Sequence, residues 1–391
     1  QRVRMSPHER AEALMRAAAL LGDRRAAMVE TIVAEAGFTR SDAEGEVTRG
    51  IQTLQASADE ARRLAGDVIP LAGAPLQENR IGFTLRVPLG VICAITPFNS
   101  PLNTLLHKLA PALAAGNSVV VKPASATPLT ANRVVEILIE AGFPAELIAL
   151  LHGPGGRIGA WLCDEPDIRF YAFTGSTEVG LRIQGSAGLR RTQMELGSIA
   201  ATILNHDADL AAALPKVLRA GYRKAGQVCT SIQRLYVHAD VYDQVRDRLA
   251  DEVKALKYGD PHRDDTFVGP LISEQEAKRI EAWIGEAVAG GATLLAGGTR
   301  QGPVVAPTLL ENVTPQMRVM AEEIFGPVVV LRRFRMIDEA IDEINATPYG
   351  LAAGIFTRDL EVGFRAARRL DVGGLHINET SSSRVDVMPY G

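Results

Sequence analysis

Apolar and polar positions follow two different periods along this chain, and the periods indicate where helices and strands lie. In the N-terminal part the helical period predicts helices over residues 7–22, 24–36 and 42–64. From residue 90 onward, short β-branched runs alternate with helical segments. Strands are predicted at 91–95, 118–122, 147–151, 168–173 and 192–196, and helices at 101–115, 128–141, 157–163 and 176–184. This alternation over short links predicts an α/β fold with a parallel sheet covered by helices.

After residue 196 the pattern restarts and predicts a second α/β domain. Its strands are expected at 232–237, 304–309, 328–331, 352–356 and 374–377, and its helices at 208–225, 241–256, 274–289, 336–345 and 360–370. Residues 67–88 break the helical pattern with two short extended runs, 68–71 and 80–87. We interpret this segment as a β-excursion, either a subunit-pairing arm or an ordinary hairpin.

Composition narrows the class of protein. A chain of 391 residues with 47% hydrophobic content is too long for one core. The net charge of -4 gives no basic field for nucleic acid, and no apolar run has the roughly 20 residues that a membrane span needs. The chain starts at Gln1 without Met and stops at Gly391 in what reads as a loop, so we expect missing pieces at both ends.

Cysteine and histidine usage argues against metal and disulfide frameworks. The three cysteines, Cys93, Cys163 and Cys229, are odd in number and show no CxxC spacing. The seven histidines show no paired metal-ligand spacing. We therefore expect no metal site and a reducing, cytoplasmic compartment.

The segment 226–231, Gly-Gln-Val-Cys-Thr-Ser, follows an Ala-rich helical stretch and precedes an apolar run. This order puts Cys229 on a turn between a helix and a strand. Cys93 sits inside an apolar run, as a packing cysteine does, and for Cys229 alone packing is also the simpler interpretation. Its position on a turn makes it a candidate nucleophile.

Three segments follow strands at one edge of the first predicted sheet. Residues 173–180, Phe-Thr-Gly-Ser-Thr-Glu-Val-Gly, lie where a strand becomes a helix, which suits a phosphate but also an ordinary tight turn. Lys122 ends an earlier strand, where a lysine can bind a ribose or phosphate or lie exposed on a loop. Asn99, in the Pro-rich segment 96–102, can cap a helix or aim its amide at an oxyanion.

One carboxylate stands in an apolar strand, and the others fit a loop or a solvated face. Glu195 ends an apolar strand, a setting that suits a general base. Residues 322–328, Glu-Glu-Ile-Phe-Gly-Pro-Val, read alone as a loop before a strand. Glu44 and Glu46 fit a solvated helix face, and Arg49 on the same helix is an open case.

Together these segments resemble the aldehyde dehydrogenase family. The resemblance rests on six motifs in the family's order: Thr-Pro-Phe-Asn at 96–99, Val-Lys-Pro-Ala at 121–124, residues 173–180, Glu-Leu-Gly at 195–197, Gly-Gln-Val-Cys at 226–229 and Glu-Ile-Phe-Gly-Pro at 323–327. They cover essentially the whole chain. The resemblance implies the aldehyde dehydrogenase fold, with two doubly wound parallel-sheet domains and a small β oligomerisation arm.

The resemblance also implies catalytic roles. Cys229 is the expected nucleophile, which forms a thiohemiacetal and then a thioester, and Asn99 with the Cys229 backbone N–H forms the expected oxyanion hole. Glu195 is the expected base for hydrolysis. The cofactor is NADP or NAD. The expected cofactor contacts are Ile95, Thr96, Lys122, Ser125, Gly155, Gly175, Ser176, Gly180, Leu196, Glu323 and Phe325.

The family's layout gives the expected domains and assembly. We expect a dinucleotide-binding domain at 1–66 and 87–195, an oligomerisation arm at 67–86, and a catalytic domain at 196–391. A homodimer or homotetramer follows from the arm. Ser198 departs from the family pattern, which usually has a glycine there.

Two further positions bear on cofactor and substrate. NAD-preferring members often have a glutamate where this chain has Ser125, so we expect NADP to be accepted. The segment 381–386, Ser-Ser-Ser-Arg-Val-Asp, falls at the substrate-entrance loop, where Arg384 could bind an anionic aldehyde, with Arg49 as a second candidate. A CoA-acylating relative and a non-catalytic protein of this fold are the alternatives, and the presence of Glu195 and Cys229 argues against them.

Overall fold

The computed structural model describes residues 4–385 and residue 388 of the chain. Its contacts divide the chain into two compact units. The first unit comprises residues up to Thr31 and 45–194, and the second comprises 32–44 and the residues from Glu195 onward. Within the second unit, the Lys224 ammonium lies over the ring of Phe38, 4.5 Å from its centroid.

The first unit is built on a five-stranded sheet with the strand order β5-β4-β3-β6-β7. Its β3 pairs in parallel with both β4 and β6, and β4 pairs in parallel with β5. The strands of this sheet are β3 (Val91–Ile95), β4 (Ser118–Lys122), β5 (Ile148–Leu150), β6 (Ile168–Thr174) and β7 (Arg191–Glu195). The bounds of β3 and β4 agree with the expected ones, which confirms that β-branched runs between turns mark the strands here.

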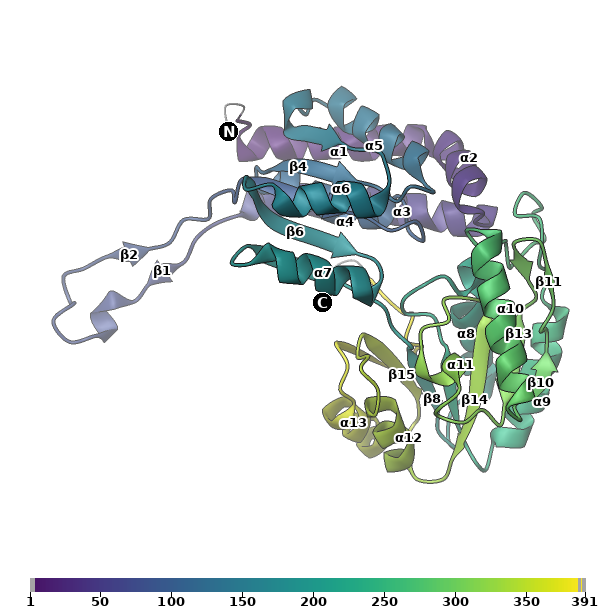
Figure 1. Ribbon diagram of the computed structural model, residues 1–391. Helices are drawn as coiled ribbons and strands as arrows, with labels where there is room; N and C mark the ends of the chain where they lie inside the picture. Colours follow the sequence, from purple (N-terminus) through teal and green to yellow (C-terminus); the bar gives the residue numbers. More distant parts are fainter. Residues whose placement is uncertain (1–3, 386–387, 389–391) are drawn as a thin grey trace. The chain divides into compact units, whose positions relative to one another are not determined.

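Helices surround this sheet, as Figure 1 shows. They are α1 (Pro7–Asp23), α2 (Arg25–Ala36), α3 (Arg40–Arg63), α4 (Asn103–Ala114), α5 (Pro128–Glu140), α6 (Gly155–Asp164) and α7 (Thr177–Ala187), with a 3₁₀ turn η2 (Ala145–Leu147). Helix α1 begins at a capping box, in which the Ser6 hydroxyl accepts from the Glu9 N–H and the Glu9 carboxylate accepts from the Ser6 N–H.

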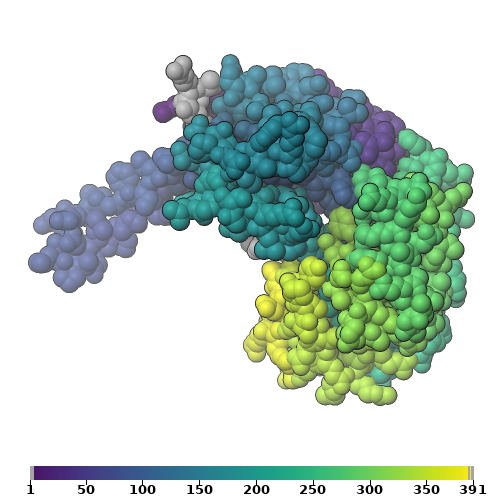
Figure 2. All heavy atoms as spheres, in the orientation of Figure 1, coloured from purple at the N-terminus to yellow at the C-terminus, as the bar shows by residue number. Residues whose placement is uncertain are grey.

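A β-ribbon projects from the first unit (Figures 1 and 2). It consists of β1 (Val68–Ile69), the 3₁₀ turn η1 (Leu71–Gly73) and β2 (Gly82–Phe83). The two strands pair antiparallel, with Val68 opposite Phe83. The predicted β-excursion at 67–88 is therefore a short two-stranded ribbon.

The second unit is built on a seven-stranded sheet with the order β10-β13-β14-β9-β8-β15-β16. All pairs are parallel except β10 with β13, which pair antiparallel at the edge. Its strands are β8 (Ala201–Leu204), β9 (Arg234–His238), β10 (Thr293–Ala296), β13 (Thr308–Glu311), β14 (Val328–Phe334), β15 (Ala352–Phe356) and β16 (Gly374–Ile377). A separate hairpin pairs β11 (Arg300–Gln301) with β12 (Val304–Val305).

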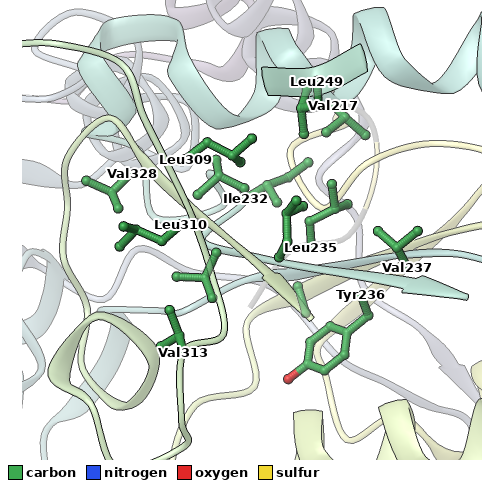
Figure 3. Packing of buried hydrophobic residues seen from close by; sticks show 14 of the residues in the cluster. Val217, Ile232, Leu235, Tyr236, Val237, Leu249, Leu309, Leu310, Val313 and Val328 are labelled. Atoms are coloured by element: carbon green, nitrogen blue, oxygen red, sulfur yellow. The ribbon is translucent and has the colours of Figure 1, made fainter. Parts of the chain in front are cut away.

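The helices of the second unit pack against this sheet over an extensive apolar core. They are α8 (Leu210–Tyr222), α9 (Tyr242–Ala255), α10 (Glu274–Ala289), α11 (Arg318–Ala321), α12 (Ile337–Asn345) and α13 (Leu360–Arg369), with a 3₁₀ turn η3 (Arg223–Gly226) after α8. Figure 3 shows Val217 of α8 and Leu249 of α9 beside Leu235 of β9 and Leu309 of β13. Full burial of such side chains contributes roughly 1.5–3 kcal/mol each.

Three expectations for the second unit need correction. The expected strand at 304–309 is divided into β12 and β13, because Pro307 has no N–H for a sheet ladder. The structure adds elements that the pattern did not indicate: β8, which is fully buried, and β10, β11 and α11. The expected helix at 208–225 ends at Tyr222, for a reason that concerns the cysteine loop.

Candidate active site

Cys229 is half-buried in the loop between η3 and β9, as its place between a helix and a strand predicted. The residues before it have unusual backbone angles. Lys224 and Ala225 adopt the left-handed conformation, with φ of 52° and 53°, and Gly226 follows with φ of 69°. The chain thus turns out of the helical path after Tyr222. Because left-handed backbone costs a non-glycine residue roughly 1–2 kcal/mol, neighbouring contacts must hold this turn.

Side chains on both sides hold the turn. The buried Gln227 donates from Nε2 to the Lys224 carbonyl at 3.1 Å and accepts at Oε1 from the Ile272 N–H at 2.9 Å. Asp42 Oδ2 accepts from the Lys224 N–H at 3.1 Å. The Ser231 hydroxyl donates to the Ala220 carbonyl at 2.8 Å. The loop before and after Cys229 is therefore fixed to three other segments of the second unit.

A second loop, residues 322–327, lies against this turn. A Cβ on Gly226 would be 2.0 Å from the Gly326 carbonyl oxygen, so only glycine allows the two backbones to approach so closely. Between them is a small cavity that is open to solvent. It is lined by Ser198, Gly226, Val228, Ser231, Ile232, Gln233, Glu323, Ile324, Phe325, Gly326 and Val328.

Glu323 brings a carboxylate to this cavity. Its Oε1 accepts from the Ser198 backbone N–H at 2.9 Å. Burial raises the pKa of Glu323, and the hydrogen bond from Ser198 opposes that rise. The backbone of Ser198 makes the contact, so the serine in place of a glycine does not remove it. Phe325, which also lines the cavity, has a left-handed φ of 49°.

Gln233 is a supporting residue that the sequence analysis missed. It is buried, its Oε1 accepts from the Ile324 N–H at 3.1 Å, and its Nε2 donates to the Val319 and Glu322 carbonyls at 3.0 and 2.7 Å. One side chain thus fixes the backbone on both sides of Glu323. Its only sequence signal is an amide next to the apolar run of β9.

Glu195 is the last residue of β7 and is half-buried. Leu196 follows it, also half-buried, and leads to Ser198 at the cavity wall. The segment that contains the expected base therefore continues directly into the cavity lining.

The expected substrate-entrance loop contacts the residue next to Cys229. The Ser381 hydroxyl donates to the Thr230 carbonyl at 2.9 Å, and the Ser382 and Thr230 hydroxyl oxygens are 3.2 Å apart. Arg223 Nη2 donates to the Ser382 hydroxyl at 2.8 Å. Arg223 was not predicted, although it stands six residues before Cys229 where α8 ends. The half-buried Arg384 follows in the same loop, and Asp386 lies outside the described residues.

In the first unit, the strands' carboxyl ends bring several expected cofactor contacts to one sheet edge. Ile95 is in register with Lys122 of β4 and with Phe173 of β6. Thr96 continues the ladder, because its N–H donates to the Lys122 carbonyl at 3.1 Å. Ligands of parallel α/β sheets bind at such an edge.

Lys122 and Ser125 differ in exposure. Lys122 is only 4% exposed, its Nζ donates to the Pro123 carbonyl at 2.7 Å, and burial lowers its pKa. Ser125 is exposed, and its hydroxyl donates to the Gly153 carbonyl at 3.2 Å.

Two helices begin near the same strand ends. Ser176 caps α7 by accepting from the Val179 N–H at 3.5 Å, and Gly155 is the first residue of α6. A Cβ on Gly175 would lie 2.6 Å from the Phe173 ring, so a larger residue there would have to displace that ring. Gly180 is buried within α7. A helix N-terminus of this kind can interact favourably with an anion.

Asn99 and Arg49 also belong to the first unit. Asn99 is 9% exposed and lies in the loop between β3 and α4. Arg49 is half-buried on α3. Among the described residues, no cluster of His, Cys, Asp and Glu could hold a metal ion, and no helix is long and apolar enough to cross a membrane.

Comparison with known proteins identifies the class. The sequence pattern of the aldehyde dehydrogenase family matches residues 3–391. A 3-sulfolactaldehyde dehydrogenase of Priestia aryabhattai is 46% identical over 386 residues, which are 99% of this chain and 81% of that protein. The chain belongs to the aldehyde dehydrogenase family.

Two solved structures agree. Aldehyde dehydrogenase 21 of Physcomitrella patens, in complex with the reaction product succinate, has a TM-score of 0.96 and 39% identity, covering 99% of this chain and 81% of that one. The NADP-dependent glyceraldehyde-3-phosphate dehydrogenase of Bacillus halodurans, complexed with NADP, gives 0.96 at 38% identity and the same coverage. The predicted fold and family are confirmed, and the protein is an NAD(P)-dependent aldehyde dehydrogenase.

Proposed function

We propose that this enzyme oxidises a small anionic aldehyde to its carboxylic acid, with Cys229 as the nucleophile. The Cys229 thiolate attacks the aldehyde carbon, and its own backbone N–H and the Asn99 amide donate to the oxygen that becomes negative. When bound, the dinucleotide accepts a hydride from the substrate carbon. Glu195 takes a proton from the water that hydrolyses the acyl group from sulfur. The observation that supports this proposal most is the held left-handed turn that presents the half-buried Cys229.

The residues present suit a dinucleotide. The buried Lys122 and the N-terminus of α7 offer positive groups at one strand edge, and the cavity beside Glu323 offers a carboxylate for hydroxyl groups. We propose that the dinucleotide passes close to the backbone along that edge, at Ile95, Thr96, Gly155, Gly175 and Gly180. Leu196 and Phe325, which lie in the second unit, are the remaining proposed cofactor contacts.

We propose that NADP is accepted at least as well as NAD. A carboxylate at position 125 would repel a 2′-phosphate, whereas this chain has the neutral Ser125 there. The Ser125 hydroxyl donates to the Gly153 carbonyl, and to bind the 2′-phosphate it must donate to the phosphate instead. In kcat/KM measurements with both cofactors, Ser125→Glu should shift the preference toward NAD by at least about tenfold. A strong preference of the parent enzyme for NAD would contradict this assignment.

Anionic substrates are supported by the entrance loop and by the relatives. Arg223 and Arg384 bring two guanidinium groups to the segment that contacts Thr230, the residue after Cys229. Guanidinium groups bind sulfonate, phosphate and carboxylate with paired hydrogen bonds. The similar proteins are named for 3-sulfolactaldehyde and glyceraldehyde 3-phosphate, and one was solved with succinate. Arg49 stays a second candidate.

The test compares aldehydes that carry a sulfonate, phosphate, carboxylate or no charge, with NAD(P)H absorbance as the readout. Anionic aldehydes should exceed the neutral one by at least about tenfold in kcat/KM, and Arg223→Met should remove most of that advantage. Arg219→Gln, on the exposed face of α8 one turn earlier, is the matched control and should leave it unchanged. An equal kcat/KM for the neutral and the anionic aldehydes would exclude an anion site. A separate variant, Cys229→Ala, tests the nucleophile and should lose all turnover.

We further propose that the β-ribbon pairs subunits into a dimer or tetramer. The ribbon exposes an apolar row, with Ile81 89%, Phe83 66% and Leu85 74% exposed. Exposed apolar side chains in a row mark an interaction surface. Light scattering should show a smaller particle for Ile81→Glu combined with Phe83→Glu than for the parent, and an unchanged mass would refute this role.

We also propose a cytoplasmic location. No disulfide joins the cysteines of the described residues, which is typical of a reducing compartment. Cell fractionation of the tagged protein tests this, and recovery in a secreted or membrane fraction would contradict it.

A further inference from the structure

A carboxylate is buried beside the loop that contains Asn99. Glu46 lies on α3 and is 3% exposed, although its sequence pattern fits a solvated helix face. The Ser100 hydroxyl is within hydrogen-bond distance of both carboxylate oxygens, at 2.8 and 2.9 Å. The Asn103 backbone N–H donates to Oε2 at 3.1 Å. The interpretation of Glu46 as a solvated residue is therefore wrong.

The carboxylate takes the place of a helix cap. Helix α4 begins at Asn103, and Leu102 before it provides no side-chain cap. A negative charge at this point satisfies an N–H that the helix leaves without a partner and interacts favourably with the helix dipole. Glu46 thus fixes the start of α4 from the side.

Helix α3 contacts α4 closely around this point. A Cβ on Gly50, one turn beyond Glu46, would be 3.0 Å from Leu106 Cδ1. Further along α3, the Thr53 hydroxyl donates to Asn103 Oδ1 at 2.9 Å. The position of Glu46 relative to Asn103 is therefore fixed by packing and by a second polar contact.

Asn99 lies between two anchored residues. On one side the Thr96 N–H donates to the Lys122 carbonyl at 3.1 Å, and on the other side Ser100 contacts Glu46. Desolvating a carboxylate is costly, and an apolar residue at this helix position would avoid that cost. The charge is explained by the donors it binds, and one of them is adjacent in the chain to Asn99.

We propose that Glu46 is a positioning residue that aims the Asn99 side-chain amide at the substrate oxygen. This inference rests on the proposed role of Asn99 as an oxyanion donor. An oxyanion donor works only within a narrow range of distance, and a displacement of about 1 Å can cost about a hundredfold in rate. A carboxylate that fixes Ser100 restricts how far the neighbouring Asn99 can move.

The experiment is a double-mutant cycle between Glu46→Gln and Asn99→Ala, with kcat/KM for the aldehyde and the dissociation constant of NADPH as readouts. Glu46→Gln keeps the side-chain volume and one acceptor oxygen. Asn99→Ala should lower kcat/KM about a hundredfold, in line with the loss of one oxyanion donor. Glu46→Gln alone should lower it about tenfold with NADPH binding unchanged, and less than about twofold when Asn99 is already alanine.

The outcomes separate the two proposals. If Asn99→Ala leaves kcat/KM unchanged, the role of Asn99 fails. If Asn99→Ala lowers it but Glu46→Gln has no effect, or multiplies the loss fully in the double variant, Glu46 is a structural cap and the positioning role fails. Should Glu46→Gln not fold, Ser100→Ala replaces it in the same cycle, with the same expected non-additivity. Glu60→Gln, at an exposed carboxylate on α3 paired with Arg63, is the matched control.

Discussion

The Cys229 loop and the Asn99 loop are held in place by different means. The cysteine loop bends through Lys224, Ala225 and Gly226 in left-handed conformations, and close backbone packing and amide contacts hold that bend. The Asn99 loop has no positive φ between Thr96 and Asn103, and it depends on a buried charge, that of Glu46. The nucleophile should therefore be sensitive to changes of backbone shape, and the amide to loss of charge.

Gly226→Ala should be the most damaging change. The new Cβ would lie 2.0 Å from the Gly326 carbonyl oxygen at a residue with φ of 69°, so two backbone segments must shift. We expect a loss of more than about 4 kcal/mol in the free energy of unfolding, or failure to fold. Urea titration checks this. Gly285→Ala, in open space within α10, should instead be neutral or stabilise by roughly 0.5–1 kcal/mol. A well-folded Gly226→Ala enzyme would show that close packing does not hold the turn.

Gln227→Leu should come next. It removes the side-chain acceptor of the Ile272 N–H, while the Lys224 carbonyl keeps the hydrogen bond from the Gln227 backbone N–H. A buried backbone N–H that loses its partner costs about 1–3 kcal/mol, and the lost side-chain bond to Lys224 adds to that, so we expect a loss of about 2–3 kcal/mol in the free energy of unfolding. The exposed Gln275→Leu on α10 is the control, with an expected effect within about 0.5 kcal/mol. If Gln227→Leu changed the free energy of unfolding as little as that, Gln227 would not hold the turn.

The sequence predicted what depends on local pattern. The strand ends that gather Ile95, Lys122 and Phe173 follow from short β-branched runs before turns, and the family resemblance is confirmed. The environment of a polar side chain was not predictable. Glu46 stands in the helical pattern where a solvated residue is expected, and only the packing of α3 on α4 buries it. Arg223 was missed because its helix ends in a left-handed turn, and nothing in the segment 223–226 excludes a continued helix.

Ser100→Ala tests the charged side of the comparison. The substitution removes the hydroxyl that donates to Glu46, while the Asn103 N–H still binds the carboxylate. A hydrogen bond to a charged group contributes about 1.5–3 kcal/mol, so we expect a loss of about 2 kcal/mol in the free energy of unfolding. Thermal unfolding checks this. The control is Ser41→Ala, at an exposed position on α3, the helix that contains Glu46, and it should be nearly neutral. If the two substitutions had equal effects, Ser100 would not depend on the carboxylate.

Ala225→Gly should have the smallest effect, and its sign depends on the backbone conformation. Glycine removes the left-handed cost of roughly 1–2 kcal/mol, but it loses a buried methyl group, worth about 0.8 kcal/mol, and adds unfolded-state entropy of about 0.4–1 kcal/mol. These contributions nearly cancel, so stability should stay within about 0.5 kcal/mol of the parent. Ala250→Gly makes the same change at a buried site in the middle of α9, where no left-handed cost is relieved, and should lose about 2 kcal/mol. Equal losses at the two positions would mean that Ala225 is not strained, and the cysteine loop would then resemble the Asn99 loop in needing only its side-chain contacts.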